Sequence, residues 1–116
     1  MIVSMQLEEL IAFIDRSVSD AGRGNYKHDP DINKRILANM LKLVEEVGEL
    51  SSEILWHLKL QREEKLPKFT PETLQDEFGD TLISTLRLAR IMNIDVQWIL
   101  EQRVKKIQTR IDESKK

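Results

Sequence analysis

Two pairs of acidic residues share the same spacing and follow one another along the chain. Glu46 and Glu49 are three residues apart within "EVGE", and Glu77 and Asp80 are three residues apart within "EFGD". On a helix, residues three apart project side by side, about 60° apart around the axis. Each pair therefore offers two carboxylates that can hold one hard cation.

Two such pairs placed face to face would bring four carboxylates together. Like charges at close range repel unless protons or metal ions neutralise them. Mg²⁺ suits such a site because it prefers oxygen ligands, keeps several waters and often joins carboxylates to the phosphates of a substrate. The competing interpretation of each pair is an ordinary solvated helix face. The face that carries Glu46 and Glu49 fits this interpretation, since other polar residues share it opposite an apolar stripe.

The segment around Glu77 and Asp80 is less ordinary. The side that bears them continues within two turns into Leu88 and Ile91, while Phe78 and Leu82 begin a second apolar side. A helix that is apolar nearly all round is buried. We therefore expect these two carboxylates to face the protein interior or an interface, where unpaired carboxylates are costly.

Apolar periodicity and capping residues predict four helices and no strand. The predicted helices cover about residues 3–20, 30–63, 71–92 and 96–111, and the tail at 112–116 is expected to fray. Asp29 and Thr70 are the predicted N-caps of the second and third helices, and each is followed by a proline, Pro30 or Pro71, as the first helical residue. Asn93 is predicted to end the third helix in the left-handed conformation, and Asp95 is the predicted N-cap of the fourth. The second helix is long for a small domain, so a bend near Gly48 is one expectation. Its apolar stripe consists of Ile36, Met40, Val44, Val47, Ile54 and Leu58. The expected architecture is an all-α four-helix bundle with short connections, completed by a second copy of the chain.

Length and composition limit the function classes. A chain of 116 residues forms one domain, taken here as 1–116, and 20 acidic against 18 basic residues argue against nucleic-acid binding through bulk charge. The absence of cysteine excludes disulfides, thiolate metal sites and cysteine nucleophiles. No apolar run reaches the length of a membrane span, so we expect no membrane partner and a cytoplasmic location.

Other chemistries lack their motifs. Neither His28 nor His57 lies three residues after a glutamate, as a carboxylate-bridged di-iron bundle requires, and His57 is expected at the surface or its boundary. The sequence has no Gly-x-x-x-x-Gly-Lys-Ser/Thr phosphate loop and no Gly-x-Ser-x-Gly elbow.

The two acidic motifs, in the contexts "KLVEEVGEL" and "DEFGDTL", resemble the signature of the all-α nucleoside triphosphate pyrophosphohydrolases. This MazG-like superfamily includes all-α dUTPases, dCTP pyrophosphatases and phosphoribosyl-ATP pyrophosphohydrolase. The resemblance covers about residues 37–110. It implies that Mg²⁺, with Mn²⁺ as an alternative, is held by Glu46, Glu49, Glu77 and Asp80.

The resemblance also implies roles for residues outside the acidic pairs. Lys106 and Arg110 match basic residues that meet the triphosphate. Val104 departs from a phosphate-binding asparagine found in many relatives, and Arg103 or Lys105 are candidate substitutes.

Four further residues are candidates for substrate binding or catalysis. Trp56 matches an aromatic that lies against the base, although a tryptophan of the core or of a dimer interface fits equally well. Tyr26 would stack on a base or pack against the end of the bundle. Glu45 or Glu53, beside the ligand pair, is a candidate for positioning the attacking water.

The implied reaction is Mg²⁺-dependent hydrolysis of a nucleoside triphosphate to a monophosphate and pyrophosphate, which clears non-canonical or surplus nucleotides. The implied assembly is a homodimer or higher homo-oligomer. One alternative is a non-catalytic helical interaction module. Another is a phosphoribosyl-ATP pyrophosphohydrolase, which the sequence resembles less because Leu82, Ile83 and Ser84 replace that group's tyrosine and histidine.

Overall fold

The computed structural model describes residues 4–20, 30–60 and 69–116, and within these ranges the protein consists of four α-helices without a strand. The helices are α1 (Leu7–Asp20), α2 (Ile32–His57), α3 (Pro71–Ile91) and α4 (Val96–Ser114). The all-helical prediction is therefore confirmed. None of these four helices is both long and apolar enough to cross a membrane.

Capping groups explain where α3 and α4 begin. The Thr70 side chain accepts a hydrogen bond from the Thr73 N–H, and Asp95 accepts one from the Trp98 N–H. Asn93 adopts the left-handed conformation, with φ 58°, at the turn between the two helices. These three sequence predictions are confirmed. α4 also continues to Ser114, so the expected fraying at 112–114 is wrong.

The predicted limits of α2 need correction. Asp31 caps the helix by accepting a hydrogen bond from the Asn33 N–H at 3.0 Å, so Pro30 precedes the helix instead of opening it. The helix passes Gly48 without interruption and ends at His57 because Lys59 takes the left-handed conformation, with φ 59°. The predicted cap Asp29, the turn at 22–25 and Tyr26 lie outside the described residues.

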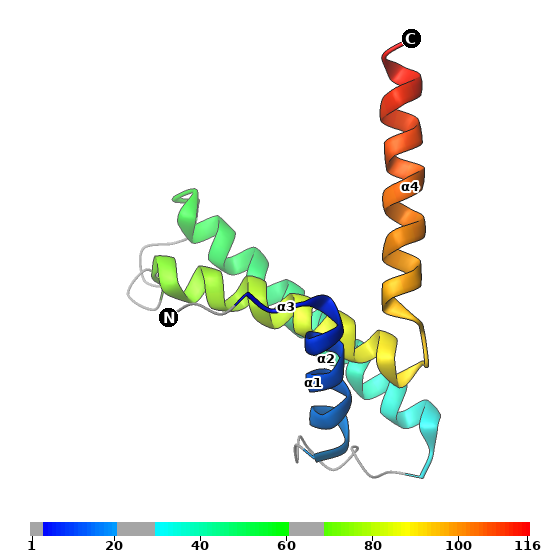
Figure 1. Cartoon of the computed structure of the whole chain (residues 1–116). Helices are drawn as coiled ribbons and strands as arrows, with labels where there is room; N and C mark the ends of the chain where they lie inside the picture. Colours follow the sequence, from blue (N-terminus) through cyan, green and yellow to red (C-terminus); the bar gives the residue numbers. More distant parts are fainter. Residues whose placement is uncertain (1–3, 21–29, 61–68) are drawn as a thin grey trace.

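The helices do not form a closed bundle within one chain (Figure 1). α2 and α3 run antiparallel and pack along much of their length, and α1 packs against α3. α4 meets α1 and α3 near its own start and then projects away from the other helices. The expected compact four-helix bundle is therefore found only in part.

The apolar stripe of α2 lies on the outside of the described structure. Leu41 and Val44 are each 62% exposed, and Met40, Val47 and Leu58 of the same side are also exposed. The opposite, polar side of α2 packs against α3. The solvated face that we considered for Glu46 is thus the buried face, and an apolar surface is left open.

Candidate metal centre

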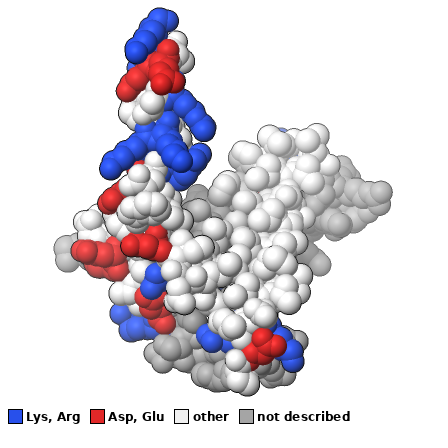
Figure 2. All heavy atoms as spheres, turned by 90° about the vertical axis from the view of Figure 1, so that its right-hand side faces the viewer, with Lys and Arg blue, Asp and Glu red and all other residues white. Residues whose placement is uncertain are grey.

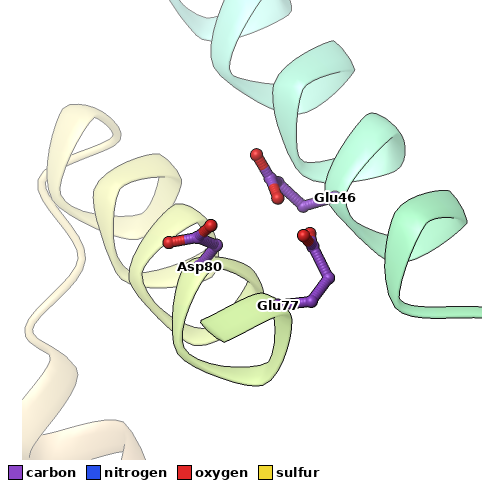
Figure 3. A group of neighbouring side chains, drawn as sticks. All are labelled: Glu46, Glu77 and Asp80. Carbon is purple, nitrogen blue, oxygen red and sulfur yellow. The ribbon is translucent and has the colours of Figure 1, made fainter. Parts of the chain in front are cut away.

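Three acidic side chains meet between α2 and α3 (Figure 3). Glu46 extends from α2, and Glu77 and Asp80 extend from α3 toward it. Each offers one carboxylate oxygen, and these oxygens all lie within 4.8 Å of one another. The two acidic motifs, which are about 30 residues apart in the sequence, are therefore brought together by the antiparallel packing of two helices.

A seven-residue repeat of buried polar residues explains this convergence. Glu46 and Glu53 are seven residues apart on α2, Glu77 and Ser84 are seven apart on α3, and all four are buried. Residues seven apart lie on one face of a helix. Among the described residues, by contrast, only Ile14 and Val96 are buried apolar side chains. The α2–α3 contact is thus built around carboxylates, which is unusual for an ordinary packing interface.

Thr81 helps fix the alignment of the two helices beside the cluster. Its Oγ1 donates a hydrogen bond to the carbonyl of Glu77 at 2.8 Å and lies 3.4 Å from the carbonyl of Glu46. A threonine that bonds back to its own helix while touching the facing backbone holds the helices at close range. This contact thereby holds the acidic side chains of α2 and α3 at the same level along the two helix axes.

Glu77 is the electrostatic centre of the cluster. Burial of its carboxyl group, followed by the proximity of Glu46, raises the pKa of Glu77 to about 8, and the charges of Glu49 and Asp80 add to this rise. Its Oε1 atom is buried and accepts no hydrogen bond from the residues that the structure describes. Glu77 therefore carries a proton at neutral pH unless a cation takes the place of that proton.

Lys42 supplies one positive charge to the cluster. Its Nζ lies 3.0 Å from Glu46 Oε1 and 3.5 Å from Glu45 Oε1. The hydrogen bond to Glu46 raises the pKa of the Lys42 ammonium, so this group stays charged at neutral pH. This role of Lys42 was not predicted from the sequence, although its position four residues before Glu46 is the signal for such a pair.

The cluster fits a hard divalent cation. Carboxylate oxygens are the ligands that Mg²⁺ and Mn²⁺ prefer, and a buried carboxylate oxygen without a hydrogen bond is costly unless a cation or proton meets it. Asp80 is exposed while Glu46 and Glu77 are buried, so the cluster is closed on one side and open to solvent on the other. Waters and an anionic ligand can therefore reach a cation bound by these three residues.

The other predicted acidic residues occupy different positions. Glu49 is exposed and outside the cluster of three, although its charge is close enough to act on Glu77. Glu45 is exposed and faces Lys42. The structure thus brings together three of the four predicted metal ligands and places Glu49 beside them.

Glu53 joins α2 to the start of α3. Its Oε2 accepts a hydrogen bond from Thr73 Oγ1 at 2.9 Å, and the same Thr73 oxygen accepts the Thr70 N–H at 2.9 Å. The Thr70 and Thr73 side chains each cap the backbone of the other, which completes a capping box. This arrangement favours a structural role for Glu53, in contrast to the water-positioning hypothesis.

Thr73→Val is expected to lower the free energy of unfolding by about 1–2 kcal/mol, because it removes one half of a capping box and a hydrogen bond to a buried carboxylate. Urea denaturation measures this loss. Thr85→Val is the matched control, since Thr85 is exposed and its Oγ1, among the described residues, donates only to the carbonyl of Thr81 in its own helix. Equal losses in the two variants would contradict the role given to Thr73.

The predicted substrate-binding residues are dispersed in one chain. Trp56 is half-buried near the end of α2 and stacks on Phe69, with ring centroids 6.2 Å apart and an interplanar angle of 24°. Lys106 and Arg110 are exposed on the projecting part of α4, where basic side chains gather (Figure 2). One chain alone therefore does not bring them to the acidic cluster. Val104, on the same helix, is also exposed.

Comparison with known proteins identifies one family. The family model described as the MazG nucleotide pyrophosphohydrolase domain matches residues 34–114, which is more than half of the 116-residue chain. The matched region contains both acidic motifs, Lys42, Trp56 and all of α4. Searches of curated proteins and of solved structures gave no significant match.

Proposed function

Because the chain belongs to the MazG nucleotide pyrophosphohydrolase family, we propose that it hydrolyses nucleoside triphosphates between the α and β phosphates, giving a monophosphate and pyrophosphate. The observation that carries this proposal is the cluster of Glu46, Glu77 and Asp80, in which the two glutamates are buried and the aspartate is exposed. Its biological role, in this proposal, is to remove non-canonical or surplus nucleotides.

The residues of the cluster, with Glu49 beside them, would hold Mg²⁺ or Mn²⁺. The bound cation would supply charge stabilisation for the triphosphate and would acidify a water for attack on the α-phosphorus. Phosphoryl transfer depends mainly on positioning and electrostatics, so this ligand set needs no covalent nucleophile from the protein. The exposed side of the cluster, at Asp80, is where the substrate phosphates would enter.

Base recognition would take place toward the end of α2. Trp56 lies two helical turns beyond Glu49, and its ring is already stacked on Phe69. A half-buried aromatic pair offers a flat apolar wall on which a base can stack. We therefore retain Trp56 as the proposed base-binding residue, with Phe69 as its support.

Dimerisation would cover the open face of α2. Leu37, Leu41, Val44, Gly48, Ser51, Leu55 and Leu58 follow one another at alternating spacings of four and three residues, the pattern of a helix seam that packs against another helix. Of these, the five large apolar residues are exposed, and a Cβ atom added at Gly48 would meet nothing within 4 Å. Monomeric proteins rarely expose an apolar surface of this extent. We propose that a second copy of the chain packs here.

Assembly would also give α4 a role. Leu100, Val104, Ile107 and Ile111 are exposed apolar side chains of α4, and among the described residues this helix meets other helices only near its own start. Packing of α4 in a homo-oligomer would carry Lys106 and Arg110 with it. These two basic residues remain our proposed ligands for the triphosphate, acting in the assembled protein.

Leu41→Glu is expected to convert the dimer to a monomer, because it places a charge within the apolar seam of α2. Sedimentation velocity at micromolar concentration measures the change. Ala12→Glu adds the same group at an exposed position of α1, away from the seam, and is expected to leave the dimer intact. A monomeric wild-type protein would contradict the proposed assembly.

Product analysis tests the proposed reaction. Wild type and Asp80→Asn are incubated with Mg²⁺ and a panel that contains canonical and modified ribo- and deoxyribonucleoside triphosphates and phosphoribosyl-ATP, and the products are separated. The proposal predicts monophosphate and pyrophosphate from the wild type only. Turnover of phosphoribosyl-ATP alone would assign the same site to that substrate, and no turnover of any of these compounds would favour a non-catalytic interaction module.

A further inference from the structure

Lys42 is the cation that the described part of the chain places directly against the acidic cluster. Its ammonium lies 3.0 Å from Glu46 Oε1, while Glu46 itself is buried. The Lys42 side chain keeps 41% of its surface exposed. The charged end of this side chain can therefore move into solvent without disturbing the packing between α2 and α3.

The pair between Lys42 and Glu46 competes with the proposed metal site for the same carboxylate. A divalent cation held by Glu46, Glu77 and Asp80 would draw on the same carboxylate, whose Oε1 atom now faces the ammonium. Two cations at one carboxylate repel each other, and the repulsion is strong where protein excludes water. Release of Lys42 from Glu46 is the change that relieves this repulsion.

The released ammonium would stay within one helical turn of the cluster, because Lys42 and Glu46 are four residues apart on α2. Lysine is a flexible point charge that binds phosphate oxygens well. The proposed substrate carries several negative charges on its phosphate chain and would enter at the exposed side of the same cluster. Lys106 and Arg110 stand on the projecting part of α4 and are not near this place in one chain (Figure 1).

We propose that Lys42 exchanges partners during the reaction cycle: it neutralises Glu46 in the metal-free protein and binds a phosphate oxygen of the triphosphate once Glu46 binds the divalent cation. This inference rests on the proposed function. It assigns two opposite effects to Lys42: the residue weakens the binding of the metal and strengthens the binding of the substrate.

Two binding constants measured on Lys42→Met test the exchange, because methionine keeps most of the length of the side chain and removes its charge. The first is the affinity for Mn²⁺ alone, followed by electron paramagnetic resonance. The second is the affinity of the Mn²⁺-loaded protein for inorganic tripolyphosphate, a phosphate chain without a base. Loss of a competing cation should tighten Mn²⁺ binding by about threefold or more, and loss of a charge-assisted hydrogen bond should weaken tripolyphosphate binding by about tenfold.

Two further variants serve as controls. Lys42→Arg keeps the charge and should restore both constants to near the wild-type values. Lys34→Met removes a charge from the same helix, three turns before Glu46, and should change neither constant.

The results separate this inference from the function on which it rests. If the wild type binds Mn²⁺ and Lys42→Met changes only one of the two constants or neither, the exchange is wrong and the metal site stands. The same conclusion follows if Lys34→Met produces the same changes. If the wild type binds no Mn²⁺, the proposed function fails, and the role of Lys42 fails with it.

Discussion

Turnover of nucleoside triphosphates is expected to fall by about a thousandfold or more when Glu77 is replaced by glutamine, because the loss of a metal-bound carboxylate removes several kcal/mol of transition-state stabilisation. Glutamine has nearly the same shape as a protonated glutamate. The pKa of Glu77 is about 8 in the metal-free protein, so the substituted side chain replaces one that is already neutral at pH 7. We therefore expect activity to be lost while the fold is kept.

Two measurements check this expectation. Steady-state rates with Mg²⁺ give the loss of activity, and urea denaturation without metal gives the free energy of unfolding, which should stay close to that of the wild type. Glu72→Gln is the matched control, because Glu72 is exposed in the first turn of the same helix. A Glu77→Gln variant that keeps its activity, or a Glu72→Gln variant that loses as much, would contradict the assignment.

Metal affinity is expected to rise steeply between pH 5 and pH 8. Below its pKa of about 8, Glu77 holds a proton that must leave when a divalent cation binds to the carboxylate. Release of one proton changes the affinity by up to about tenfold per pH unit. Calorimetric titration of Mn²⁺ at several pH values measures this slope. Glu77→Gln should bind Mn²⁺ weakly and with a much smaller pH dependence, and a flat profile for the wild type would contradict the proton–metal exchange.

The same pKa sets the sign of the pH dependence of stability in the metal-free protein. The folded-state pKa of Glu77 is raised above the ordinary value of 4.5, so the folded state binds the proton more tightly than the unfolded state. Stability from this group is fully present below about pH 4.5 and is lost as the pH rises toward 8. Saturating Mn²⁺ should reverse this trend, because a ligand that binds only the native state stabilises it.

The four helices were predicted from the sequence, and the meeting of the two acidic motifs was predicted in part, since Glu49 lies outside the cluster. Capping chemistry at Thr70, Asn93 and Asp95 is local, so these predictions depended on a few neighbouring residues. The burial expected for Glu77 is found, whereas Asp80, for which it was also expected, is exposed. The second apolar side of α3, at Phe78 and Leu82, is exposed as well, so apolar residues on several sides of a helix did not predict which of them the chain covers. The end of α2 could not be predicted in the same way, because Lys59 adopts the left-handed conformation without a glycine or asparagine.

The face of α2 that packs within the chain could not be read from periodicity. Hydrophobic periodicity identifies the side of a helix that is covered, but it does not say whether the same chain or another copy covers it. In α2 the polar side, with Glu46 and Glu53, packs against α3, and the apolar side around Val44 stays open. The same limit applies to α4. Its apolar side predicted that the helix packs in a bundle, but within one chain most of α4 projects away from the other helices.

Two residues that support the acidic cluster were missed in the sequence. Lys42 and Thr81 were not predicted as parts of the site, because each acts through a contact with another residue and neither belongs to an acidic motif. Lys42 pairs with Glu46, and Thr81 bridges the backbones of the two helices. Such supporting contacts depend on the packing of α2 against α3, which only the structure shows.

Hydrolysis in ¹⁸O-labelled water, with Mg²⁺ titrated from zero, tests most directly whether this cluster is the catalytic metal site of a triphosphate pyrophosphohydrolase. The account predicts no turnover without the cation, turnover that saturates with Mg²⁺, and a label found in the monophosphate and absent from pyrophosphate. Release of orthophosphate, a label in pyrophosphate, or turnover that does not depend on a divalent cation would contradict it.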